Sequence, residues 1–395
     1  MTRQNFIRVV SLGSEEKILE EIGFDSSYLS VAKNKYIFKL IKITDLSIPQ
    51  ANIIKQTCLS VGADAAVNKN VITGKIEFSD LMIGATLAQY KEIIKKLAAQ
   101  PFSLSVVAKK LQQELNSSLT PIKIRNKLFD WENNTYLMGI LNVTPDSFSD
   151  GGNFFDEKTA ILQAESLILD GADIIDVGGE STRPFAQSVD VDEEIKRVIP
   201  IIKAIRNIDA DIPISIDTRN SKTADFAINA GADIINDVSG FDWDAQMMYV
   251  AKDLNVPIVV QHSLSSPDKM QSNPEYDGNV VSCVFNNLAE KIDKACEFGI
   301  SKENIIADVG IGFGKTIENN YELIKRADEF KSLGCALLYG VSRKSLITKV
   351  LEVDVTQTEE ANLALATYLA VKKVNILRVH NVASHKKILK VLKYL

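Results

Sequence analysis

Beyond residue 130, short apolar runs alternate with amphipathic stretches along the whole chain. Stretches such as 157–172 and 221–232 carry apolar residues at helical spacing. The apolar runs are almost continuous, as expected of parallel strands that are buried on both faces. We therefore expect strands at residues 136–143, 173–178, 213–218, 233–238, 257–262, 304–310, 336–342 and 375–381.

Eight strands alternating with helices over roughly 245 residues predict an α/β fold of the (β/α)8 TIM-barrel type. A long open α/β sheet is the alternative arrangement of the same elements. Polar and charged residues recur at the end of every expected strand, whereas an open sheet would gather them at one switch point. This distribution favours the barrel.

The first part of the chain has a different pattern and predicts a small α+β domain. We expect strands at 5–11 and 36–43 and helices at 48–60, 87–99 and 104–115. The polar stretch 116–127 contains a proline and is typical of a linker. The expected domains are therefore 1–125 and 131–395. The first contains no dense cluster of catalytic residue types.

Two phrases in the barrel region are alike. GADIIDVGGES at 171–181 and GADIINDVSG at 231–240 each place Gly-Ala-Asp before a strand of the same length. Glycine tolerates the left-handed conformation that ends many helices, so each Gly-Ala is expected to close the preceding helix. Either an internal duplication or convergent loop chemistry explains the similarity.

Composition narrows the class of protein. The 395 residues are 46% hydrophobic and 24% charged, which excludes a disordered or fibrous chain. The net charge of −6 disfavours nucleic acid as a partner. Apolar runs fall well short of the ~20 residues that span a bilayer. The N-terminus also lacks a signal-peptide pattern, so we expect a soluble, cytoplasmic protein. Four scattered cysteines and three histidines make a zinc site improbable and favour free thiols in a reducing compartment.

The residues at the strand ends fall into chemical groups. Asp217, Asn236 and Asp308 offer acceptors and an amide, which suit a planar heterocycle that presents N–H groups. A separate cationic set suits phosphate oxygens. Asn142 is a hard oxygen ligand that suits Mg²⁺, which keeps most of its waters and binds substrate phosphates. Electrostatic catalysis on a diphosphate-bearing heterocycle is therefore favoured. The cationic set consists of Arg183, Lys344, Arg378 and His380.

Several motifs resemble the dihydropteroate synthase family. MGILNVTPDSFSDGG at 138–152 looks like its first signature and DVGGESTRP at 176–184 like its second. SIDT, INDVSG, GFGK, GVSRKS and RVHN follow in the family's order. The resemblance implies a transferase of folate biosynthesis that joins (7,8-dihydropterin-6-yl)methyl diphosphate to 4-aminobenzoate. It also implies Mg²⁺, a homodimer and a target of sulfonamides.

The resemblance assigns roles to residues that match the motifs. Asp217, Lys344 and Arg378 would carry the catalysis, and Asn142 would bind the metal. The pterin set would be Asp217, Asn236, Asp308 and Lys344. The diphosphate set would be Asn142, Thr182, Arg183, Arg378 and His380, and the 4-aminobenzoate set would be Phe148, Pro184, Phe313 and Ser345.

Some features depart from the family pattern or have no assigned role. Val309 stands where a proline is usual and Ile311 where a phenylalanine is usual, and QHSLSSP follows the fifth strand. The N-terminal domain resembles an extension of some bacterial members, for which we expect a structural or assembly role, with binding or regulation as the alternative. Two other functions share such a barrel: a corrinoid-linked methyltetrahydrofolate methyltransferase and a non-catalytic pterin-binding protein.

Overall fold

The computed structural model describes residues 7–144, 157–180, 189–264 and 274–395. The chain divides into two units, Met1–Ser117 and Ser118–Leu395. This division falls a few residues before the expected end of the first domain at 125. Within the described ranges, no helix is long and apolar enough to cross a membrane.

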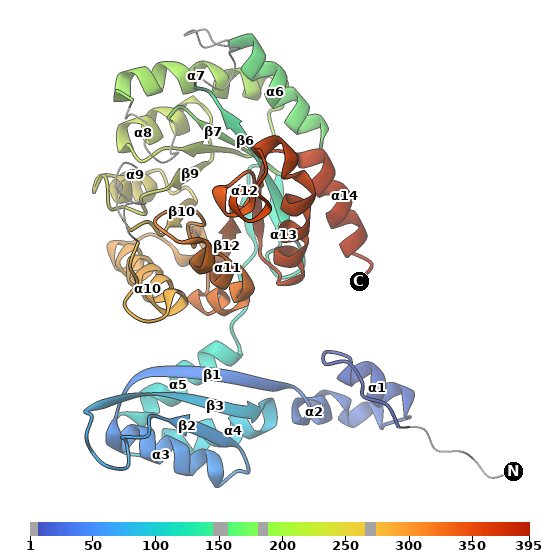
Figure 1. The fold of residues 1–395 in the computed structure, drawn as a ribbon, viewed down its shortest axis with the longest axis vertical. Helices are drawn as coiled ribbons and strands as arrows, with labels where there is room; N and C mark the ends of the chain where they lie inside the picture. Colours follow the sequence, from blue (N-terminus) through green and yellow to red (C-terminus); the bar gives the residue numbers. More distant parts are fainter. Residues whose placement is uncertain (1–6, 145–156, 181–188, 265–273) are drawn as a thin grey trace, which may run out of the picture. The chain divides into compact units, whose positions relative to one another are not determined.

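The N-terminal unit is built on a three-stranded antiparallel sheet of order β1-β3-β2 (Figure 1). Alternate residues of the sheet face three helices, and the shared core includes Ile54, Ile83, Tyr90 and Leu97. The expected strand at 36–43 and the three expected helices are confirmed. The elements are β1 (Phe38–Ser47), α3 (Ile48–Leu59), β2 (Asp64–Val67), β3 (Phe78–Thr86), α4 (Leu87–Ala98) and α5 (Leu104–Leu115), after the short helices α1 (Glu15–Glu21) and α2 (Leu29–Ala32).

The strand expected at 5–11 is wrong over its described part. Residues 7–11 have no regular structure, and Ile7 and Val9 are fully exposed. An apolar run forms a stable strand only where a sheet accepts its hydrogen bonds and covers its side chains. The described N-terminal unit offers this segment no such sheet position.

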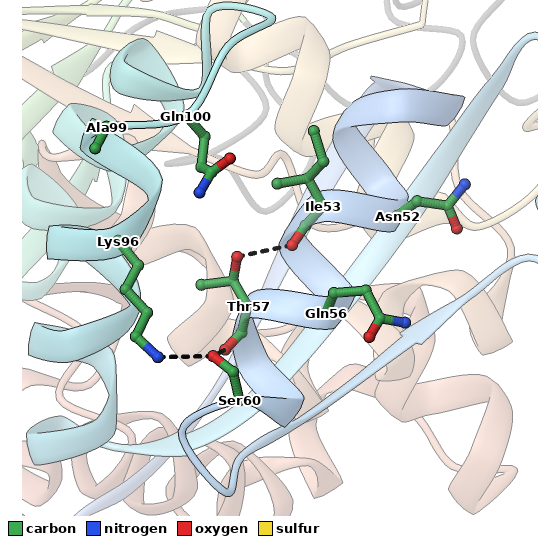
Figure 2. A pocket seen from close by; sticks show the side chains of 8 residues that line it. All are labelled: Asn52, Ile53, Gln56, Thr57, Ser60, Lys96, Ala99 and Gln100. Carbon is green, nitrogen blue, oxygen red and sulfur yellow. Dashed lines mark hydrogen bonds between the residues drawn. The ribbon is translucent and has the colours of Figure 1, made fainter.

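A groove of about 570 Å³ lies between α3 and α4. Figure 2 shows that Lys96 reaches across it from α4, and its Nζ donates to Ser60 Oγ at 2.8 Å. Thr57 Oγ1 donates to the carbonyl of Ile53 within α3. These polar groups satisfy one another locally, so the groove needs no ligand to explain them.

The second unit is a closed barrel of eight parallel strands, which confirms the expected fold. The strands neighbour one another in the order β10-β11-β12-β13-β6-β7-β8-β9. They are β6 (Tyr136–Asn142), β7 (Ile174–Gly178), β8 (Ile214–Asp217), β9 (Ile234–Asp237), β10 (Ile258–Gln261), β11 (Ile305–Asp308), β12 (Ala336–Tyr339) and β13 (Ile376–Val379). Each expected strand of the barrel matches one of these.

Helices surround the barrel (Figure 1). Their apolar faces and the outward-facing strand residues form one continuous core, in which Ile175, Val177 and Ile235 are fully buried. The described helices are α6 (Glu157–Leu169), α7 (Val191–Ile208), α8 (Ser221–Ala230), α9 (Met247–Asp253), α10 (Val280–Phe298), α11 (Ile317–Lys325), α12 (Ser345–Leu351), α13 (Glu359–Val371) and α14 (Val382–Leu392).

Apolar side chains fill the lower part of the barrel interior. Met138, Ile174, Val259 and Ile306 belong to this inner cluster, and all are fully buried. A hairpin of β4 (Ile122–Ile124) and β5 (Lys127–Phe129) contributes to the same cluster at the amino ends of the strands. Asp217 and Asp308 lie at the opposite, carboxyl ends of their strands, where such enzymes build their active sites.

The aspartates of the two Gly-Ala-Asp phrases have matching structural roles. The N–H of Asp173 donates to Leu137 O, and the N–H of Leu137 donates to the Asp173 carboxylate at 2.8 Å. Asp233 makes the same exchange with Ile214, where the return bond is 2.9 Å. Each aspartate thereby fixes its strand beside the preceding one. The repeat thus contributes to strand alignment at the amino ends of the barrel.

Candidate active site

The barrel brings the strand-end residues predicted for the pterin together. Asp217 ends β8, Asn236 lies on β9 and Asp308 ends β11, and all three side chains are buried. Strands β8 and β9 are neighbours, and Asp217 is in register with Asn236. Parallel strands end on the same rim of a barrel, which explains why residues far apart in sequence share one site.

Arg378 lies between two carboxylates. Its Nε donates to Asp176 at 2.6 Å and its Nη2 to Asp217 at 2.6 Å. Burial opposes the charge of Arg378, but the two neighbouring carboxylates outweigh it and raise the pKa of the guanidinium. Arg378 was predicted to bind the diphosphate, and the structure shows that two sides of its fork already hold carboxylates. Its Nη1 group forms the remaining side.

Asp217, which ends β8, and Asn236, on β9, each have one acceptor atom without a hydrogen-bond partner in the described part of the chain. These atoms are Asp217 Oδ1 and Asn236 Oδ1, both buried. Burial raises the pKa of Asp217 to about 7, an effect that Arg378 opposes and Asp176 reinforces. A buried oxygen without a hydrogen bond is costly, so a ligand with two N–H groups complements this pair.

Lys344 and Phe313 lie together beside Asp308. The Lys344 Nζ donates to the carbonyl of Ile311 and stands 4.6 Å from the centre of the Phe313 ring. Burial lowers the pKa of Lys344 to about 8, although Asp308 acts in the opposite direction. Burial raises the pKa of Asp308, and Lys344 opposes that rise. The ammonium therefore titrates close to neutral pH.

The remaining predicted residues of the described chain lie on β6, α12 and the end of β13. His380 Nδ1 is 3.0 Å from Ser342 Oγ, which orients the imidazole. Ser345 is the first residue of α12 and is exposed. Asn142 is the last residue of β6. Its side-chain oxygen lies above Gly178, where a Cβ would stand 3.7 Å from it and 3.7 Å from Asp217 Oδ2.

The surroundings of Asn142 fit a magnesium ion that substrate phosphates help to bind. The described residues contain no group of three or more His, Cys, Asp or Glu able to enclose a metal. Asn142 offers one neutral, hard oxygen, and the absent side chain of Gly178 leaves space beside it. Mg²⁺ commonly keeps several waters and uses one or two protein oxygens together with substrate phosphates.

Four predicted residues lie outside the described ranges: Phe148, Thr182, Arg183 and Pro184. Glu180, the described residue before 181–188, forms a buried ion pair with Arg219. Glu180 accepts from Arg219 at 2.8 and 3.1 Å and also from the N–H of Val189 at 3.1 Å. Arg219 in turn lies 3.8 Å from the centre of the Trp243 ring. The described residues on either side of 181–188, Glu180 and Val189, are thus joined directly by a hydrogen bond.

Sequence reasoning assigned no role to a buried lysine in the GFGK motif. Lys315 Nζ lies 3.0 Å from His262 Nδ1 and donates to the carbonyl of Phe313 at 2.9 Å. Burial, together with the nearby Lys315, lowers the pKa of His262 to about 2, so the imidazole is neutral. The only signal for this contact was the polar character of both strand ends.

The departures from the family pattern at 309 and 311 are accommodated by the core. Val309 and Ile311 are fully buried in the main hydrophobic cluster. Gly310 adopts a φ of +66°, and a Cβ there would stand 2.0 Å from the carbonyl oxygen of His262. Only glycine allows this loop to approach the end of β10 so closely. The turn is therefore built without the usual proline.

The closed eight-stranded barrel and its acceptor-rich rim define a protein of the (β/α)8 class. The family model described as "Pterin binding enzyme" matches residues 138–380. The chain belongs to this family and, within it, to the dihydropteroate synthases.

Similar proteins cover different parts of the chain. The dihydropteroate synthase of Clostridium beijerinckii is 46% identical over 67% of this chain and 96% of its own length. A crystal structure of the Clostridium difficile enzyme, determined in the presence of pteroic acid, has a TM-score of 0.63 at 41% identity, over 67% of this chain and 98% of that one.

A probable bifunctional folylpolyglutamate synthase/dihydropteroate synthase of Haloferax volcanii is 39% identical over 84% of this chain. The barrel unit makes up less than three quarters of the chain, so this match extends into the N-terminal unit. The chain spans only 40% of the length of that relative. Part of the N-terminal unit therefore has a counterpart in a longer protein.

Proposed function

We propose that this chain condenses (7,8-dihydropterin-6-yl)methyl diphosphate with 4-aminobenzoate to give 7,8-dihydropteroate and diphosphate. The observation that carries the proposal is the pair of unpartnered acceptors in the described site, Asp217 Oδ1 and Asn236 Oδ1, beside a cationic set. A pterin presents adjacent N–H groups on its pyrimidine edge, and a diphosphate requires cations. One substrate thus satisfies both halves of the site.

The carboxylates bind the pterin and favour its cationic form. The C–O bond between the pterin methylene and the diphosphate breaks, and its electron pair leaves with the diphosphate. The amine nitrogen of 4-aminobenzoate then forms the new C–N bond and releases a proton to water. Asp217 and Asp308, both buried, lower the energy of the positive charge that develops on the pterin. We propose a largely dissociative substitution, which needs no strong base for the weakly basic aniline.

We propose that the leaving diphosphate binds beside Lys344, His380 and the Nη1 side of Arg378. Asn142 would hold Mg²⁺ together with phosphate oxygens, and the ion would neutralise charge on the departing group. Thr182 and Arg183 are proposed to add contacts to the diphosphate. Phe148, Pro184, Phe313 and Ser345 are proposed to form the 4-aminobenzoate pocket. Phe313 adjoins Lys344, which links the two substrate positions.

We also propose a cytoplasmic homodimer. The four cysteines are all free, and Cys58 and Cys335 are buried, as in proteins of reducing compartments. The N-terminal unit is proposed to have a structural or assembly role. Light scattering of the full chain and of residues 118–395 measures the mass of each, and a monomeric full chain would contradict the dimer.

Turnover of the two substrates with Mg²⁺ tests the function. The full chain is incubated with the dihydropterin diphosphate and 4-aminobenzoate, and dihydropteroate and diphosphate are quantified. Equal amounts of both products are expected, with at least about a hundredfold less from Lys344→Ala. Binding of the pterin without turnover would instead support a non-catalytic pterin-binding protein. Methyl transfer from methyltetrahydrofolate to a corrinoid would support the methyltransferase.

A further inference from the structure

Asp176 and Asn236 occupy the same position in the two repeated phrases, GADIID at 171–176 and GADIIN at 231–236. They lie on β7 and β9, which are separated by one strand in the barrel. Side chains from alternate strands of such barrels meet in the interior. Accordingly, Asn236 Nδ2 lies 3.3 and 3.2 Å from the two carboxylate oxygens of Asp176.

The Asp176 carboxylate is completely buried. It accepts from Asn236 and, at 2.6 Å, from Arg378 Nε. An ionised carboxylate only accepts hydrogen bonds, so Asn236 must turn its NH₂ group toward Asp176 and its oxygen away. That oxygen is one of the two unpartnered acceptors described above. Asp176 itself offers no atom to solvent.

We propose that Asp176 is a positioning residue for the pterin. It fixes the amide of Asn236 so that the amide oxygen, and not the NH₂ group, faces the heterocycle. It also holds Arg378 beside Asp217. The proposal rests on the proposed function, because a pterin is the ligand whose N–H groups meet these acceptors. It assigns a purpose to the repeat beyond the alignment of strands.

The substitution Asp176→Asn isolates this effect because it keeps the size of the side chain. An amide at position 176 can still accept from Arg378 through its oxygen, but its NH₂ group then faces the NH₂ group of Asn236. The Asn236 amide relieves this contact by turning over, which directs a donor at the pterin. A donor facing a donor leaves both without a partner.

The expected result is a selective loss of pterin affinity. For Asp176→Asn, the KM for the dihydropterin diphosphate and the calorimetric Kd of 6-hydroxymethyl-7,8-dihydropterin should each rise about 10- to 100-fold. The KM for 4-aminobenzoate should change by less than about threefold. Ser215→Ala is the matched control, because Ser215 is buried and in register with Asp176 on the neighbouring strand. It should alter neither constant.

Exchanging the two residues restores the arrangement. In Asp176→Asn with Asn236→Asp, the new amide donates to the new carboxylate, whose second oxygen again faces the pterin. This double variant should recover at least about tenfold of the lost pterin affinity. A purely structural role would lower thermal stability without this recovery.

Several outcomes would overturn the proposal. These are an unchanged pterin Kd in Asp176→Asn, an equal rise in both KM values, or a double variant no better than the single one. In each case an active wild type leaves the proposed function standing. A wild-type protein that neither binds nor converts the pterin would overturn both.

Discussion

The charge on Lys344 makes the reaction sensitive to pH slightly above neutrality. Burial lowers the pKa of this lysine from 10.5 to about 8, so half of the molecules lose the charge at that pH. About one tenth stay protonated one pH unit higher. The proposed function uses the protonated form, because the ammonium lies beside Asp308 and is placed next to the leaving diphosphate. Activity is therefore present below the folded-state pKa and lost as the pH rises through it.

The assay is kcat/KM for the dihydropterin diphosphate from about pH 6 to 10, at saturating 4-aminobenzoate. We expect kcat/KM to rise through about pH 7, as Asp217 ionises, and to decline above about pH 8 by nearly tenfold per pH unit, as Lys344 loses its proton. Lys344→Arg serves as the control, because a guanidinium stays charged throughout this range. Its rate should be lower, since the fork does not fit the ammonium position, but the decline above pH 8 should disappear.

Two results would refute this reasoning. A wild-type profile that stays flat to pH 10 would mean that the charge of Lys344 is not needed or that burial does not lower its pKa. A decline that persists unchanged in Lys344→Arg would assign the titration to another group.

Three further predictions concern binding, stability and domain organisation. Arg378→Lys replaces the guanidinium that contacts Asp176 and Asp217 by a single ammonium. The kcat/KM for the pterin substrate should therefore fall about 10- to 100-fold in steady-state assays. An unchanged kcat/KM would exclude a role for the guanidinium. Asp233→Ala leaves the N–H of Ile214 and the guanidinium of Arg206 without their carboxylate partner. Urea titration should therefore show a loss of about 3 kcal/mol in the free energy of unfolding. A loss below about 0.5 kcal/mol would contradict this prediction. The fragment 118–395 should retain turnover of the pterin substrate. The similar enzyme of Clostridium beijerinckii aligns over 96% of its own length with only 67% of this chain, so it matches little beyond the barrel. A fragment that is folded by circular dichroism but inactive would give the N-terminal unit a part in catalysis.

The barrel was predictable because its strands are buried on both faces. Such strands appear in the sequence as short apolar runs that end in polar residues, and Asp217 and Asp308 each mark one of those ends. The same rule failed at residues 7–11, where Ile7 and Val9 are apolar but fully exposed. Apolar character indicates a strand only when the remaining fold supplies a partner.

The positions of the candidate residues at the strand ends were predictable from the sequence, but their contacts were not. The strand ends located Asn236 and Arg378, yet no spacing in the sequence indicates that both contact Asp176. That contact depends on the stagger of alternate strands around a closed barrel. Likewise, Lys315 and His262 meet through two loops whose approach is set by the glycine at 310. Tertiary geometry, and not local sequence, determined these partners.

The most direct test of the account is a crystal structure of the full chain with the dihydropterin diphosphate and Mg²⁺. We predict pterin N–H groups within hydrogen-bond distance of Asp217 Oδ1 and Asn236 Oδ1, with the diphosphate beside Arg378 and His380. A pterin bound elsewhere, with these two oxygens still lacking a ligand, would contradict the account.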